Sequence, residues 1–255
     1  MGRYHVATAI AAIALFAGQA SAQVCIGNCG TLGPNGVVTA PPDGPTYQYV
    51  STFGGVSGNN LGGLVTGDGS ATNGSTLLSA LFGATAGDKL VFNFNYVTSD
   101  GSGFADYGWA RLLNPDMTTA AWLVTARTKP SGSIIPGQGM PGVDASLAPP
   151  SVPIIGGAPD WLPLGSYSGF CFDVGCGYTG WIQSSYTIGI TANYFLQFGV
   201  ANWQDQIWDS GLAFSGATIA GVPIDTGTIP EPGSLALLAT GLVSLVPRIR
   251  RKFKR

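Results

Sequence analysis

The feature that most constrains the fold is a two-residue alternation of side chains in short runs along the middle of the chain. In the run 89–98, the side expected to face a core consists of Leu90, Phe92, Phe94 and Tyr96, while asparagines occupy the other side. Successive side chains of a β-strand point to opposite faces, so this pattern predicts a strand. Similar runs, rich in β-branched and aromatic residues and separated by turn sequences, lie at 47–52, 107–113, 121–128, 179–188, 193–201 and 212–219.

These runs predict an all-β fold. Lysine and glutamate, which usually cover exposed helices, are scarce, and no stretch between the two ends keeps a helical period. We expect two antiparallel sheets packed face to face as a jelly-roll-like β-sandwich, flanked by an N-terminal signal helix and a C-terminal hydrophobic helix. The proline-rich segment 130–163 is predicted to be a long surface loop. We place the sandwich at 47–221, after an irregular Gly- and Pro-rich lead-in at 23–46 and before a linker at 222–228.

The charge of the body limits its partners and its chemistry. Residues 23–228 carry 12 aspartates and no glutamate against four cations, Lys89, Arg111, Arg127 and Lys129, so the formal charge is near −8. This charge predicts no attraction to nucleic acid. The sole histidine, His5, lies near the N-terminus, which leaves the body without a Ser-His-Asp triad or a histidine base. We therefore expect no catalytic residues, with a two-carboxylate glycoside hydrolase as the remaining enzymatic alternative.

The N-terminal residues 1–22 have the pattern of a secretory signal peptide. Arg3 is followed by an apolar stretch and by Ala20-Ser21-Ala22, an Ala-x-Ala cleavage site. We expect export through the Sec translocon and cleavage by signal peptidase. In an exported chain an even number of cysteines predicts disulfides, here among Cys25, Cys29, Cys171 and Cys176. Local and crossed pairings both remain open.

Four aspartates are candidate ligands for a cation. Asp100 and Asp106 border a loop of glycine and serine, and Asp205 and Asp209 follow the strand predicted at 193–201. Ca²⁺ prefers carboxylate and carbonyl oxygens, so these residues predict a possible calcium site. Aspartate is equally typical of turns, where its side chain caps the backbone.

Two tryptophans are candidate ligand-binding residues. Trp203 and Trp208 lie beside Asp205 and Asp209 in a turn-rich stretch. Flat aromatic rings stack on the apolar faces of sugars, so this placement predicts a face that binds polysaccharide.

The C-terminal segment 229–255 carries three signals in a fixed order. Pro230-Glu231-Pro232 is followed by an apolar run at 233–246 and then by a basic cluster of Arg248, Arg250, Arg251, Lys252, Lys254 and Arg255. The apolar run is shorter than the roughly 20 residues that span a bilayer. The combination closely resembles the PEP-CTERM sorting signal of Gram-negative bacteria, although Pro247 departs from the usual pattern.

That resemblance implies a route to the cell surface. PEP-CTERM tails are read by exosortase, a membrane cysteine transpeptidase, and the tail would hold the protein in the inner membrane until cleavage near the Pro-Glu-Pro. The body also resembles exported bacterial β-sandwich domains that occur with PEP-CTERM or alternative anchors, through 94–100, 106–113, 198–200 and 209–214. Together the resemblances imply a surface or matrix protein with a non-catalytic binding or structural role in the envelope or exopolysaccharide. A calcium-stabilised carbohydrate-binding or adhesive module is the alternative.

Overall fold

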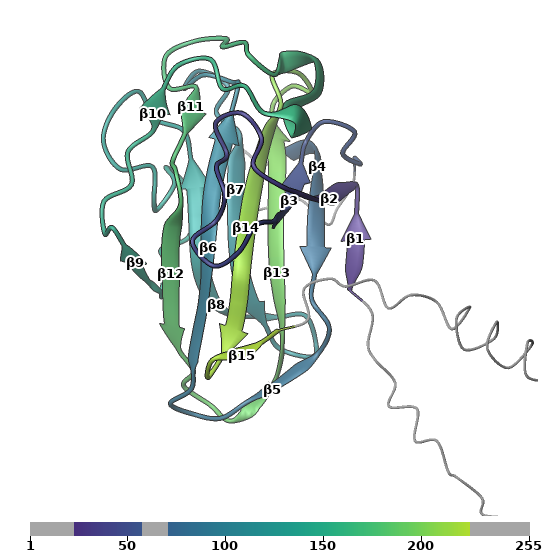
Figure 1. The fold of residues 1–255 in the computed structure, drawn as a ribbon, viewed down its shortest axis with the longest axis vertical. Coiled ribbons are helices and arrows are strands. Elements are labelled where there is room, and N and C mark those ends of the chain that lie inside the picture. Colours follow the sequence, from purple (N-terminus) through teal and green to yellow (C-terminus); the bar gives the residue numbers. More distant parts are fainter. Residues whose placement is uncertain (1–22, 58–70, 225–255) are drawn as a thin grey trace, which may run out of the picture.

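The chain folds into two antiparallel β-sheets packed face to face, seen in a computed structural model that describes residues 23–57 and 71–224 (Figure 1). The first sheet contains, in spatial order, β1 (Val24–Ile26), β4 (Ala71–Leu78), β13 (Ala192–Trp203), β7 (Tyr107–Leu113) and β8 (Thr119–Arg127), with β5 (Phe82–Ala84) also paired to β13. The second sheet contains β10 (Ile155–Gly156), β11 (Gly177–Tyr178), β6 (Lys89–Thr98), β14 (Ser210–Ile219), β3 (Tyr47–Ser51) and β2 (Asn28–Leu32). Three short additions complete the second sheet, with β12 (Ile182–Thr187) on β6, β9 (Ser146–Ala148) on β12 and β15 (Val222–Pro223) on β14.

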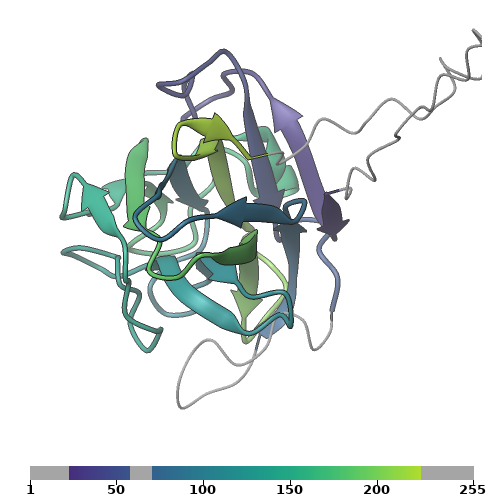
Figure 2. The same ribbon diagram turned by 90° about the horizontal axis from the view of Figure 1, so that it is seen from below.

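The prediction of an all-β fold with antiparallel sheets is confirmed. The short 3₁₀ helix η2 (Leu162–Tyr167) lies between β10 and β11 in the chain. The helices predicted at 1–22 and 229–255 lie outside the described residues. Figure 2 looks along the sandwich from the end of β5 and β15, opposite to the loops considered below.

The core lies between the two sheets and is centred on stacked aromatic rings. Phe198 of β13 stacks on Phe214 of β14 with ring centroids 3.7 Å apart and planes 6° apart, which joins the first sheet to the second. Phe92 of β6 meets Phe198 edge-on at 5.2 Å. The alternation predicted for 89–98 is confirmed, because Leu90, Phe92, Phe94 and Tyr96 all belong to the core between the sheets.

The outer face of the second sheet is also covered, which the sequence did not predict. Asn93 and Asn95 are buried on that face, and Asn93 Nδ2 donates a hydrogen bond to Asp43 Oδ1 of the N-terminal segment. Trp161 packs there in a small second core, and its indole N–H donates to Tyr47 Oη at 2.9 Å. The sheet therefore has two covered faces.

The prediction of an irregular lead-in at 23–46 is wrong in part. β1 pairs with β4 of the first sheet, and β2 pairs with β3 of the second. Glycine and asparagine at 27, 28 and 30 disfavour a strand locally, but strand pairing satisfies the backbone groups and outweighs that preference. β15 likewise lies in the stretch predicted to be a linker at 222–228.

The strand β4 was missed because its sequence is short of strand-forming residues. It carries Gly74 where a side chain would meet the carbonyl oxygen of Val200 at 2.1 Å, so only glycine permits this close pairing with β13. The other main strands lie within a few residues of their predicted ranges, and those at 89–98 and 107–113 match β6 and β7 in full.

We predict that Phe198→Ala lowers the free energy of unfolding by about 4 kcal/mol, because it leaves a cavity between the two sheets. Urea denaturation followed by fluorescence measures this. Ile190→Ala is the control, since Ile190 is 72% exposed and its truncation should change stability by less than about 0.5 kcal/mol. Equal effects of the two substitutions would contradict the assigned core.

Candidate functional site

Three segments meet at the end of the sandwich that is uppermost in Figure 1. They are 99–106 between β6 and β7, 162–176 between β10 and β11, and 203–209 between β13 and β14. We call them the site loops. Because β13 and β14 are central strands of opposite sheets, the loop that joins them crosses over the end of the core.

Asp106 links the two sheets at this end. Its Oδ1 accepts a hydrogen bond from the backbone N–H of Trp203 at 3.0 Å, and Trp203 ends β13. Its Oδ2 lies 2.6 Å from the hydroxyl of Ser210, the first residue of β14, which in turn lies 2.7 Å from Thr98 Oγ1. Each of these two oxygen–oxygen contacts requires one proton, and the Ser210 hydroxyl supplies only one. The other proton comes from the Thr98 hydroxyl or from a protonated Asp106.

Asp209 holds its loop against two neighbouring segments. Its Oδ1 accepts from Thr52 Oγ1 at 2.8 Å, just after β3. Its carbonyl oxygen accepts from the N–H and the hydroxyl of Ser99, at 3.1 and 2.9 Å. The 203–209 loop is therefore anchored to both β3 and the 99–106 loop.

Asp100 is completely buried and only partly hydrogen-bonded. Its Oδ1 accepts from the backbone N–H of Gly101 at 2.7 Å, while Oδ2 has no hydrogen-bond partner. Asn202, at the end of β13, is also buried, and its Oδ1 is likewise without a partner although its Nδ2 donates to Asn73. Unsatisfied buried oxygens of this kind usually mark a strained or functional position.

Burial keeps the carboxylates of this network in their neutral form at unusually high pH. It raises the pKa of Asp209 to about 6, against the hydrogen bonds from Thr52 and Asn202. It also raises the pKa of Asp100 to about 7, opposed by the Gly101 N–H and assisted by the negative charge of Asp205. Burial, followed by the charge of Asp100, raises the pKa of Asp106 well above its ordinary value. We call Asp100, Asp106 and Asp209 the buried carboxylate network.

Asp205, the fourth predicted cation ligand, lies at the edge of this network. It is half-buried, and its Oδ1 accepts from the N–H of Ile207 at 3.1 Å, which is a turn-capping contact. Its carbonyl oxygen accepts from the hydroxyl of Thr72. Within 23–57 and 71–224, no group of three or more histidine, cysteine, aspartate or glutamate side chains is placed to hold a metal ion. The four predicted ligands thus share one end of the sandwich without forming a closed coordination shell.

The structure separates the two tryptophans predicted to bind ligand. Trp203 packs beside Tyr107 and Trp109 on the first sheet, and the guanidinium of Arg127 lies 4.4 Å from its ring centroid. Trp208 instead lies among aromatic residues of the 162–176 loop. Its ring is 4.8 Å from Tyr167 and 5.4 Å from Phe172, measured between centroids.

Trp208 belongs to a continuous row of rings at the surface. Phe172 also contacts Phe104 of the 99–106 loop at 5.9 Å. Phe104 and Phe172 are exposed, and Tyr167 and Trp208 are half-buried. We call these four residues the aromatic surface. Sequence reasoning missed three of them, although aromatic residues inside breaker-rich loops beside a cysteine pair are a signal that could have found them.

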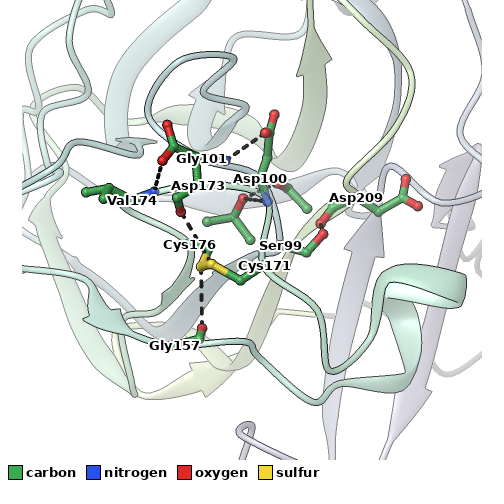
Figure 3. The surroundings of a disulfide bond; sticks show 11 residues. Ser99, Asp100, Gly101, Gly157, Cys171, Asp173, Val174, Cys176 and Asp209 are labelled. Atoms are coloured by element: carbon green, nitrogen blue, oxygen red, sulfur yellow. Dashed lines mark hydrogen bonds between the residues drawn. A yellow bond between two sulfur atoms is a disulfide. The ribbon is translucent and has the colours of Figure 1, made fainter.

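A disulfide fixes the loop that carries Phe172. Cys171 pairs with Cys176, and the loop between them lies against Ser99 and Gly101 (Figure 3). Phe172 N–H donates to the Ser99 carbonyl at 2.9 Å, and a side chain at Gly101 would meet Asp173 Cβ at 2.4 Å. The close approach requires glycine at position 101. The aromatic surface therefore rests on one loop closed by a disulfide and on a second loop hydrogen-bonded to it.

The second disulfide is local as well. Cys25 pairs with Cys29, so it links β1 of the first sheet to β2 of the second. The open question of connectivity is thus answered as two local pairs, and no cysteine is free.

The buried carboxylate network is not arranged as an exposed glycosidase pair. Asp100 and Asp106 are fully buried and Asp209 is 4% exposed, so a polymeric substrate does not reach their oxygens. Among the described residues, no helix has the length and apolar character required to traverse a bilayer. Comparisons with protein-family models, with curated proteins and with solved structures found no match.

We predict that thermal stability, measured in EDTA, falls as the pH rises from about 4 to above 7. The pKa values of Asp100 and Asp209 are raised on folding, so the folded state binds more protons than the unfolded state across this range and loses stability as they leave. Residues 23–224 contain no histidine, so these carboxyls dominate the interval. Calorimetric melting temperatures at several pH values measure the slope.

The variant Asp100→Asn should flatten this slope, whereas Asp116→Asn should not. Asp116 is exposed and hydrogen bonds from Thr118 lower its pKa, so its removal leaves the decline in place. A melting temperature that rises from pH 4 to pH 8 would show that folding does not raise the pKa values of these carboxyls.

Proposed function

We propose that this chain is an exported, exosortase-sorted protein of the cell surface or extracellular matrix, with a non-catalytic binding role in the envelope or exopolysaccharide. The sorting signal is Pro230-Glu231-Pro232 with the apolar run and basic cluster that follow, and the signal peptide is 1–22. The precursor is tethered in the inner membrane until the tail is cleaved. The sorting and anchor segment and the signal peptide lie outside the described residues.

The observation that carries the binding role is the aromatic surface. Phe104 and Phe172 are 39% and 46% exposed, although burying such rings is strongly favourable. Exposed apolar patches rimmed by polar residues usually mark interaction sites. The loops that hold them are fixed by a disulfide and a buried polar network, which lowers the entropy lost on binding.

Both disulfides support export. The pairs Cys25–Cys29 and Cys171–Cys176 form and persist in oxidising compartments such as the periplasm and the cell exterior. They are consistent with the translocon and signal peptidase as the first partners of the chain.

We also propose that the sandwich is a jelly roll. Its long strands lie in the orders β4-β13-β7-β8 and β12-β6-β14-β3. Apart from the step from β7 to β8, each strand of this set is followed in the chain by one in the opposite sheet. Alternation of this kind between the four long strands of one sheet and the four of the other supports the jelly-roll arrangement.

A calcium-stabilised version of the same module is the second candidate. The observation that favours it is the pair of buried oxygens without partners, Asp100 Oδ2 and Asn202 Oδ1, beside carboxyls of raised pKa. A divalent cation would compensate the negative charge there, and backbone, hydroxyl and amide oxygens would complete its shell.

We predict that the extracellular form begins after Ala22 and ends near Pro232, without Arg255. Intact mass measurement of protein from the culture medium tests this. Replacing Pro230, Glu231 and Pro232 by alanine should keep the full tail and retain the protein in the inner-membrane fraction. Alanines at 225–227, in the preceding linker, are the matched control and should not change sorting. Extracellular protein that keeps Arg255, or protein in the cytosol with reduced thiols, would refute the proposed route.

We predict that CaCl₂ raises the melting temperature of the exported protein at pH 8 relative to EDTA. A cation at 100 times its Kd stabilises the folded state by about 2.7 kcal/mol. The increase should disappear in Asp100→Asn and persist in Asp116→Asn. Identical melts with CaCl₂ and with EDTA would reject the calcium site and leave the sorting proposal unaffected.

A further inference from the structure

The polar side chains around the aromatic surface are either uncharged or acidic. The site loops contain no lysine, arginine or glutamate. Their exposed polar side chains next to the rings include Ser166, Asp173 and Gln206. The rim therefore offers hydroxyl, amide and carboxylate groups, and its formal charge is negative.

We propose that the aromatic surface binds an uncharged polysaccharide, with sugar rings packing on the exposed parts of Phe172 and Trp208. This inference rests on the proposed binding role and names the class of ligand. A sugar ring has an apolar face of C–H groups that packs on an aromatic face, and its hydroxyls require acceptors and donors at the edge. The aromatic surface and its rim supply both.

The arrangement of the rings suits a chain-like ligand. Phe104, Phe172, Trp208 and Tyr167 follow one another at centroid distances of 5.9, 5.4 and 4.8 Å. They come from all three site loops, so the row joins these loops to one another. A polymer with several consecutive rings could contact more than one of these side chains at once.

The charge of the rim selects among polymers. Asp173 and Asp205 belong to the site loops, which contain no lysine or arginine. The neighbouring Lys129 directs its Nζ to the carbonyl oxygen of Pro136. Polyuronates, nucleic acids and anionic lipid surfaces would be repelled there, because like charges brought together cost free energy. An uncharged polymer meets no such penalty.

The backbone of the 203–209 loop is held in an uncommon conformation. Trp208 has a φ of 59°, in the left-handed region that bulky residues rarely occupy, and Gln204 has a φ of 70°. A conformation of this kind persists only where surrounding contacts enforce it, and it clusters at binding sites. Here it is accompanied by the hydrogen bonds of Asp209 and the ring contacts of Trp208 with Tyr167 and Phe172.

The test is affinity electrophoresis of the exported protein in native gels that contain a soluble polysaccharide. Hydroxyethylcellulose, xyloglucan, galactomannan and dextran are the uncharged probes, and alginate is the anionic one. We expect retardation by at least one uncharged polymer and none by alginate. Trp208→Ala and Phe172→Ala should each weaken the apparent affinity about tenfold, which is the loss of one stacking contact.

Ile190→Ala is the matched control, because it removes an exposed apolar side chain between β12 and β13, at the opposite end of the sandwich, and should leave retardation unchanged. Circular dichroism melts of each variant establish that folding is intact. Absence of retardation by all four uncharged polymers, retardation by alginate, or retardation insensitive to both aromatic substitutions would overturn the proposal.

Light scattering separates this surface from a self-association site. Dimers of the parent protein that dissociate in Trp208→Ala would show that a second copy occupies the rings, which also overturns the proposal. Because sorting is measured by mass and fractionation, a protein that is exported but binds no glycan would refute this inference alone.

Discussion

The rest of the structure depends on the contact between β13 and β14, the central strands of the two sheets. The rings of Phe198 and Phe214 stack face to face in that contact. Phe92 packs edge-on against Phe198. Burial of these rings removes a large apolar area from water and fixes how the sheets face each other. Because the same two strands are joined by the 203–209 loop, the packing of the core also sets where Asp209 and Trp208 are presented.

The core is closed at the end that carries the site loops by a set of buried carboxyls, which are costly to ionise. Asp106 bridges β13 and β14, and Asp209 connects its loop to β3 and to Ser99. Burial disfavours the ionised forms of these carboxyls. The folded network is therefore most stable when the carboxyls are protonated or when another positive charge is close to them. The loops above it are ordered by specific hydrogen bonds together with the ring contacts of the aromatic surface. This makes the end of the sandwich both well defined and sensitive to its ionic surroundings.

The two disulfides act where the sheets alone provide little. Cys25–Cys29 holds the short strands β1 and β2, which belong to different sheets at one edge. Cys171–Cys176 closes the exposed loop that carries Phe172, and backbone hydrogen bonds hold that loop against the 99–106 loop. A loop closed over so few residues loses freedom in the unfolded chain and keeps its shape in the folded one. The aromatic rings are therefore presented on a rigid support despite their exposure.

The sequence by itself determined the all-β class, most of the long strands, the buried face of 89–98 and the even set of cysteines. These follow from local periodicity and composition, which need no knowledge of distant residues. It could not determine β1, β2 and β4, whose short or weakly strand-forming sequences become strands only because a partner strand satisfies their backbone. Nor could it determine which cysteines pair, or that Phe104, Tyr167 and Phe172 join Trp208 while Trp203 turns to Arg127. Those relations join residues from separate loops, and only the packing of the two sheets brings the loops together.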